Sequence, residues 1–100
     1  MITEVMPALS PADTAVLKGA ELLDERGPEN WREMIHLGTL SITSCQKCIL
    51  GQVFGEYAGG REFLGISPFD APHYGFAGVG LRGGAITRAW RRYLSGWTED

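Results

Sequence analysis

Short segments with helical spacing of apolar residues, separated by glycine and proline, set the strongest limit on what this chain can fold into. The sequence of 100 residues contains 14 glycines and 5 prolines, and the apolar side chains between them recur every three or four positions. Only residues 37–42 alternate loosely, as a short strand or an extended connection would. The pattern therefore predicts an all-α or mainly α fold of about four to five helices.

The first helix is marked at both ends. Ser10 can cap it, Pro11 suits its first position, and Asp13 lies three residues after the cap. An apolar stripe then continues to Gly27, which precedes a proline and ends the helix. Residues 1–9 are expected to form a loose tail of a single domain that spans the whole chain.

A long helix is expected in the middle of the chain, after a short one over residues 29–35. Thr43–Gln46 resembles a capping box, and the apolar pattern that follows predicts a helix over residues 43–57. This segment is apolar almost all round, so we expect it to be the central element of the core. Its internal glycines, Gly51 and Gly55, predict that another element packs closely against it.

The C-terminal part is predicted to contain a glycine-rich loop and a last helix. Residues 61–64 and 67–70 carry signals for short helical turns, and residues 75–84 include five glycines. The last helix is expected over residues 85–95. Its apolar stripe should bury Trp90 and consists of Ile86, Ala89, Trp90, Tyr93, Leu94 and Trp97.

Composition excludes several classes of protein. With 44% hydrophobic and 21% charged residues, the chain is typical of a globular domain rather than a disordered one. The net charge of −3 argues against a nucleic-acid partner. No apolar run reaches the roughly 18 residues of a membrane span, and the N-terminal residues do not resemble a signal peptide. We therefore expect a cytoplasmic protein with free thiols.

Cys45 and Cys48 form a Cys-x-x-Cys pair that allows three interpretations. They could be small buried core residues, a redox dithiol activated by a helix N-terminus, or zinc ligands together with His36 and His73. The core interpretation is favoured, because a thioredoxin-like fold needs a sheet and the histidine spacing fits no common zinc module. We expect no cofactor and no bound metal.

Arginines dominate the C-terminal part of the chain. Residues 1–36 carry seven acids and three bases, whereas residues 80–96 carry four arginines and no acid. Either the two regions pack together and neutralise each other, or the arginines form a surface that contacts a partner. These candidate binding residues are Arg82, Arg88, Arg91 and Arg92.

Three further residues are candidates for binding. Gln52 is a polar amide on an apolar face, so it must bond either loop backbone or a ligand. Tyr74 and Phe76 could stack on a ligand or fill the core.

Gly78–Gly83 matches G-x-G-x-x-G, but the strand and the later acid of a dinucleotide site are missing. An anion site at the start of the last helix remains a candidate.

The middle of the chain resembles a family of small proteins. The block Cys48-Ile49-Leu50-Gly51-Gln52-Val53-Phe54-Gly55-Glu56-Tyr57 matches the pattern Cys-x-Leu-Gly-Gln-x-Phe-Gly-x-Tyr, and further matches extend over about residues 28–94. This pattern is similar to that of small uncharacterised proteins encoded by actinobacteriophages and by actinobacteria, including mycobacteria and Streptomyces. The resemblance implies a phage or prophage origin, and in it Cys48 matches the family cysteine.

Taken together, these features predict a small binding protein that contacts a host or phage protein. No Ser/His/Asp set, carboxylate pair or phosphate-binding loop is present, so we expect no enzymatic activity. One alternative is a binder of a small phosphorylated ligand that uses the glycine-rich loop, Arg82 and the Tyr74–Phe76 pair. A second is a zinc-stabilised or thiol-redox protein. A homodimer is compatible with each of these functions.

Overall fold

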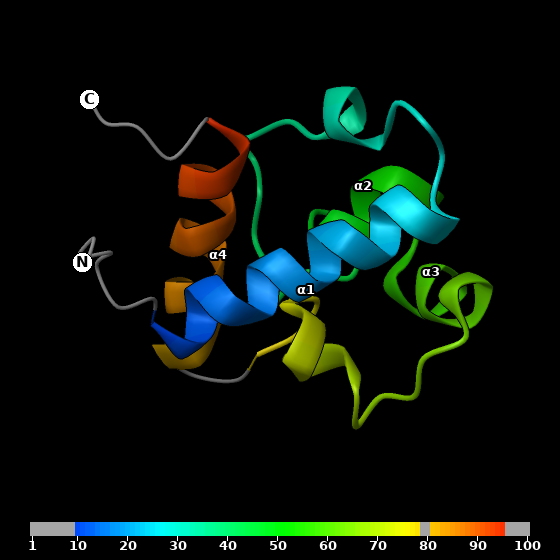
Figure 1. Ribbon diagram of the computed structural model, residues 1–100. Coiled ribbons are helices and arrows are strands. Elements are labelled where there is room, and N and C mark those ends of the chain that lie inside the picture. The colour runs from blue at the N-terminus through cyan, green and yellow to red at the C-terminus, as the bar shows by residue number, and fades with distance from the viewer. Residues whose placement is uncertain (1–9, 79–80, 96–100) are drawn as a thin grey trace, which may run out of the picture.

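The chain folds into helices joined by turns. The computed structural model describes residues 10–78 and 81–95, and the side chains of all of these except 81 and 82. It contains the α-helices α1 (Pro11–Arg26), α2 (Ile49–Phe54), α3 (Tyr57–Leu64) and α4 (Leu81–Leu94), and the 3₁₀ turns η1 (Trp31–Met34) and η2 (Ala71–Tyr74) (Figure 1). The described residues contain no strand, which confirms the all-α prediction.

Helix α1 begins and ends where its sequence signals predict. The Asp13 backbone N–H donates to Ser10 Oγ at 3.1 Å, and the Asp13 carboxylate accepts from the Ser10 hydroxyl at 2.9 Å. Together with the bond from the Ser10 N–H to Asp13, this is a capping box. At the other end the Gly27 N–H donates to the Leu23 carbonyl at 2.8 Å.

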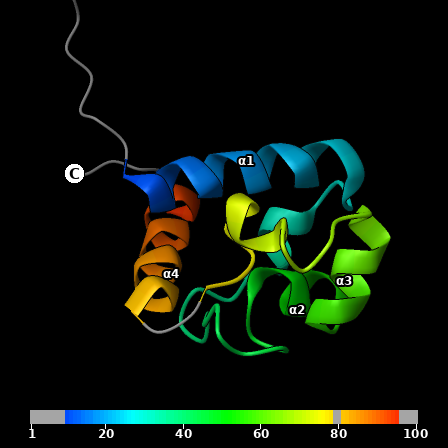
Figure 2. The same cartoon turned by 90° about the horizontal axis from the view of Figure 1, so that it is seen from below.

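Helix α1 runs along one side of the molecule and covers the other elements. Figure 2 shows α4 under the N-terminal part of α1, the α2–α3 pair under its C-terminal part, and η2 between them. None of these helices is long and apolar enough, within the described residues, to cross a membrane.

Aromatic rings from distant parts of the chain meet in the core. Trp90 is fully buried, as the last-helix pattern predicts, and its ring stacks on Phe76 at a centroid distance of 6.1 Å. The Trp31 ring meets Trp90 edge-on at 6.2 Å. The Trp90 Nε1–H donates to the Gly75 carbonyl at 2.6 Å, so the polar atom of this buried ring is satisfied.

The predicted helix over residues 43–57 is wrong as a single element. The chain forms turns up to Cys48, which caps the short α2, and α2 ends at Gly55 with a φ of 96°. Ser44 Oγ accepts from the Lys47 N–H at 3.0 Å, so this hydroxyl stabilises a turn rather than a helix start. Gly51 packs on that turn, since an added Cβ there would lie 2.4 Å from the Cys45 carbonyl oxygen. The close packing that the two glycines predicted is therefore present at Gly51, where its partner is the preceding turn. At Gly55 the prediction is wrong, because an added Cβ would meet no atom within 4 Å.

Several other boundaries also differ from the sequence-based predictions. The Gly59–Gly60 pair lies inside α3 instead of ending a helix, and residues 37–42 contain turns instead of a strand. The short helix expected over residues 29–35 is the 3₁₀ turn η1.

Helix α4 begins at Leu81, four residues before its predicted start at position 85, so the glycine-rich loop is shorter than expected. Helix α4 is tied to the segment between η1 and α2, because Thr87 Oγ1 accepts from the Ile42 N–H at 3.0 Å. Residue 97 of the predicted stripe lies outside the described residues.

Candidate functional site

Arg91 fastens α4 to the loop that follows η1. Its Nε donates to the Leu37 carbonyl at 3.2 Å and its Nη2 donates to the Leu40 carbonyl at 3.3 Å. Both carbonyls belong to residues 37–42, and the Leu37 carbonyl also accepts from the Leu40 N–H at 3.3 Å. This arginine therefore has a structural role that explains its position without a partner molecule.

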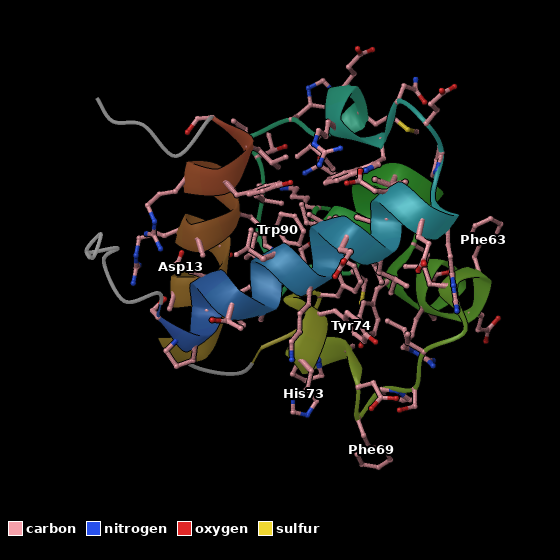
Figure 3. The ribbon with its side chains drawn as sticks, in the orientation of Figure 1. Asp13, Phe63, Phe69, His73, Tyr74 and Trp90 are labelled. Carbon is pink, nitrogen blue, oxygen red and sulfur yellow. The ribbon has the colours of Figure 1, made fainter. Side chains whose placement is uncertain are left out.

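Arg92 pairs with the start of α1. Its Nη2 lies 2.5 Å from Asp13 Oδ1, and Asp13 is buried where the two helices meet (Figure 3). Burial would raise the pKa of Asp13, but the hydrogen bonds from Arg92 and Ser10 outweigh this effect and hold it below its ordinary value. At this pair, the charge asymmetry of the sequence is satisfied by internal pairing.

The other two arginines differ from these. Arg88 is exposed, and its guanidinium forms no hydrogen bond or ion pair with any described residue. The side chain of Arg82 lies outside the described residues. The structure therefore does not bring the four candidate arginines together as one free surface.

The Tyr74–Phe76 pair belongs mainly to the core. The two rings stack at 6.1 Å, and Phe76 is fully buried between Tyr74 and Trp90. Tyr74 is half-buried at the edge of this stack and faces solvent on one side. Only Tyr74 could touch a ligand without unfolding of the core.

Gln52 holds loop backbone, which was one of its two predicted roles. Its Oε1 accepts from the His36 N–H at 2.6 Å, and its Nε2 donates to the Lys47 carbonyl at 2.8 Å. The side chain thus joins α2 to the loop after η1 and to the turn before α2. Its hydrogen-bonding groups are used within the fold.

The two thiols have different surroundings. Cys48 is fully buried at the start of α2, where its Sγ accepts from the Gly51 N–H at 3.2 Å, whereas Cys45 is exposed. Burial raises the pKa of the Cys48 thiol, although the bond from Gly51 opposes this. His36 and His73 are exposed, and no group of three or more potential metal ligands occurs among the described residues.

One exposed feature was not predicted from the sequence. Phe63 on α3 is 63% exposed, and its ring packs on the half-buried Phe54 of α2 at a centroid distance of 5.0 Å. Figure 3 shows Phe63 pointing outward from α3, while Phe69, which is 86% exposed, lies at a separate place on the loop before η2. We call the Phe54–Phe63 pair the aromatic patch. The missed signal is the Gly59–Gly60 pair, which hid the helix that carries Phe63.

The aromatic patch sits on closely packed helices beside acidic residues. A Cβ added at Gly60 would lie 2.7 Å from the Phe54 ring. The absence of a side chain at Gly60 therefore allows α3 to pack this closely against α2. Glu56, which is the N-cap residue of α3, and Glu62 within α3 are both exposed. Within the described part of the chain the ion pairs are Arg32–Asp24 and Arg92–Asp13, so both glutamates are unpaired there.

Comparisons with known proteins assign no function to these residues. No family model matches the chain, and no curated protein and no solved structure matches it either.

Proposed function

We propose that this chain is a small cytoplasmic protein of phage or prophage origin that acts by binding a host or phage protein, and that it is not an enzyme. The aromatic patch is the observation that carries the proposal. Trp31, Phe76 and Trp90 are fully buried in the core, whereas Phe63 is 63% exposed. Single exposed apolar residues are common, but contiguous exposed apolar surface marks interaction sites, and the half-buried Phe54 extends the apolar surface of Phe63.

Aromatic residues contribute most strongly to protein binding when they are held rigidly. Phe54 packs against Gly60, and Phe63 packs against Phe54, so few rotamers would have to be lost on binding. Glu56 and Glu62, which are exposed near the patch in sequence and pair with no described residue, favour a partner that surrounds an apolar site with basic side chains.

The origin of the protein and its compartment are supported by the sequence resemblance and by the thiols. The matching block includes Phe54 and ends at Tyr57, so it covers α2 and the start of α3 next to the patch. Free thiols, one of them exposed, suit a reducing cytoplasm.

Affinity purification from an actinobacterial host extract tests this function. The wild-type protein and the Phe63→Ala variant serve as baits, with Phe69→Ala as a matched control that removes an exposed phenylalanine elsewhere. We expect a partner that is retained by wild type and by the control and lost with Phe63→Ala. The interaction must then be reproduced with both purified proteins.

Two results would contradict the proposal. One is a purified partner that binds Phe63→Ala as tightly as wild type. The other is a concentration-dependent dimer that Phe63→Ala abolishes, because a second copy would then occupy the patch.

A further inference from the structure

A groove unrelated to the aromatic patch lies between α1, η2 and α4. Its volume is about 660 Å³, which falls in the range of ligand pockets. The N-terminal half of α1 forms one wall and η2 another, and Ala85 and Ile86 of α4 contribute the third. Figure 3 shows His73 on η2 at this side of the molecule.

The lining of the groove combines an apolar floor with basic and hydroxyl side chains. Ala15, Pro72 and Ile86 supply apolar surface, whereas Thr14, Lys18 and His73 supply polar groups. No acidic residue lines the groove among those that the structure describes. Since the whole chain has a net charge of −3, this groove is locally opposite in sign to the protein.

Within the described residues, Lys18 and His73 have no partner that would give them a role inside the fold. Neither side chain forms a hydrogen bond or an ion pair with any residue in the described ranges. This distinguishes them from Arg91 and Arg92, which both bond groups of the fold. Their donors remain available to a molecule in the groove.

The walls of the groove are held in a fixed position. Helix α1 approaches η2 at Gly19, where an added Cβ would lie only 2.0 Å from the Tyr74 carbonyl oxygen. The next residue, Gly75, has a φ of 71° and ends η2, and its carbonyl accepts from the Trp90 ring. Lys18 precedes Gly19 and His73 precedes Tyr74 in the sequence, so the contact between Gly19 and Tyr74 holds the backbones of Lys18 and His73 in a fixed relative position.

We propose that this groove binds a small amphipathic anion. Its carboxylate or phosphate monoester would lie between Lys18 and His73, and a short aliphatic chain would cover Ala15, Pro72 and Ile86. Charge complementarity selects the anionic group, and the apolar floor selects the chain. The site uses neither the aromatic patch nor the buried Phe76.

Titration of ¹⁵N-labelled full-length protein with octanoate and with octyl phosphate tests this proposal by NMR. We expect saturable shifts of the amide signals of Thr14, Lys18 and His73. The tighter of the two ligands identifies the head group. Octanol lacks the charge and inorganic phosphate lacks the chain, so each of these should bind much more weakly.

Matched variants separate the groove from general charge effects. Lys18→Glu should weaken the binding of both anions about tenfold or more, because a charge-assisted hydrogen bond becomes a repulsion. Lys47→Glu makes the same charge change outside the groove and should leave the dissociation constant unchanged. His73→Ala and His36→Ala form a second pair of this kind. If Lys18→Glu perturbs the fold, Lys18→Gln replaces it.

Three outcomes would overturn the proposal. These are no saturable shift with either anion, equal weakening by Lys18→Glu and Lys47→Glu, or equal affinity for octanol and octanoate. Phe63→Ala should leave anion binding unchanged, so failure of the groove and failure of the proposed protein contact can be told apart.

Discussion

Replacement of Gly19 by alanine should destabilise the protein, although the same change usually stabilises a helix. In the interior of an unpacked helix, alanine is more favourable than glycine by about 1 kcal/mol. At Gly19 the new Cβ would lie 2.0 Å from the Tyr74 carbonyl oxygen and 3.1 Å from the Trp90 ring. A carbonyl oxygen of the backbone cannot rotate out of the way, so η2 must move as a unit.

The expected magnitude follows from two opposing effects. Overpacking of a core costs about 1–3 kcal/mol, and a required displacement of more than 1 Å places this site at the upper end of that range. After the helix preference of about 1 kcal/mol is subtracted, we expect a net loss of about 2 kcal/mol in the free energy of unfolding. For a domain of this size that corresponds to a decrease of roughly 8–16 °C in the melting temperature.

Gly59→Ala is the matched control for this prediction. Gly59 lies in α3, is exposed, and has no atom within 4 Å of an added Cβ, so alanine should stabilise by about 0.5–1 kcal/mol. Urea denaturation followed by tryptophan fluorescence measures both variants, since Trp31 and Trp90 are fully buried. If Gly19→Ala were as stable as wild type, the close contact of α1 with η2 would be refuted, and the fixed wall of the groove with it.

Other variants test the core, the helix pairing and the thiols. Leu50→Ala should cost about 2–5 kcal/mol, because Leu50 is fully buried, and a melting temperature close to that of wild type would contradict its central place. Arg92→Glu should lower the melting temperature by several degrees, because it places a second carboxylate beside the buried Asp13. Arg88→Glu should change the free energy of unfolding by less than about 0.5 kcal/mol. Equal effects of the two changes would show that the Arg92–Asp13 pair contributes nothing specific. The pKa of Asp13 is lowered in the folded state, so the unfolded chain binds more protons than the folded one. The stabilisation by the ionised Asp13 is therefore present above its ordinary pKa of 3.8 and is lost as the pH falls through the folded pKa. In Asp13→Asn, the free energy of unfolding should depend less on pH in this range. In the native protein Ellman's reagent should modify Cys45 quickly and Cys48 only on unfolding, and elemental analysis should find no stoichiometric zinc; two fast thiols or bound zinc would refute the described environment.

The elements that sequence predicts well are those whose boundaries depend on local interactions. Ser10, Asp13 and Gly27 form their hydrogen bonds within one turn of α1, so their identities suffice to place both ends of the helix. In the middle of the chain the apolar spacing is equally regular, but the backbone reverses at Gly55. That reversal depends on the packing of α3 against α2, which spacing along the sequence does not describe.

The arginines of the candidate site also depend on contacts between residues far apart in the sequence. The charges along the sequence fit internal pairing and a partner surface equally well, because both require the same charges. Asp13 and Arg92 are 79 positions apart, and only the crossing of α1 and α4 brings them together. Arg88 is four positions before Arg92 on the same helix and remains unpaired by any described residue. Helical spacing alone cannot distinguish the two.

Glycines inside helices connect the fold to both proposed surfaces. Each of them lowers helix stability relative to alanine, so a close neighbour is the physical reason to keep one. Gly19 lies against the backbone of η2 and fixes a wall of the groove, and Gly60 lies against Phe54 and supports the aromatic patch. Gly59, beside Gly60 in the same helix, has no such neighbour. Sequence can therefore mark a helical glycine as unfavourable, but only the structure shows which ones have a close neighbour. Gly51 packs on the turn before α2, whereas Gly19 and Gly60 each hold an element that carries one of the surfaces proposed to bind.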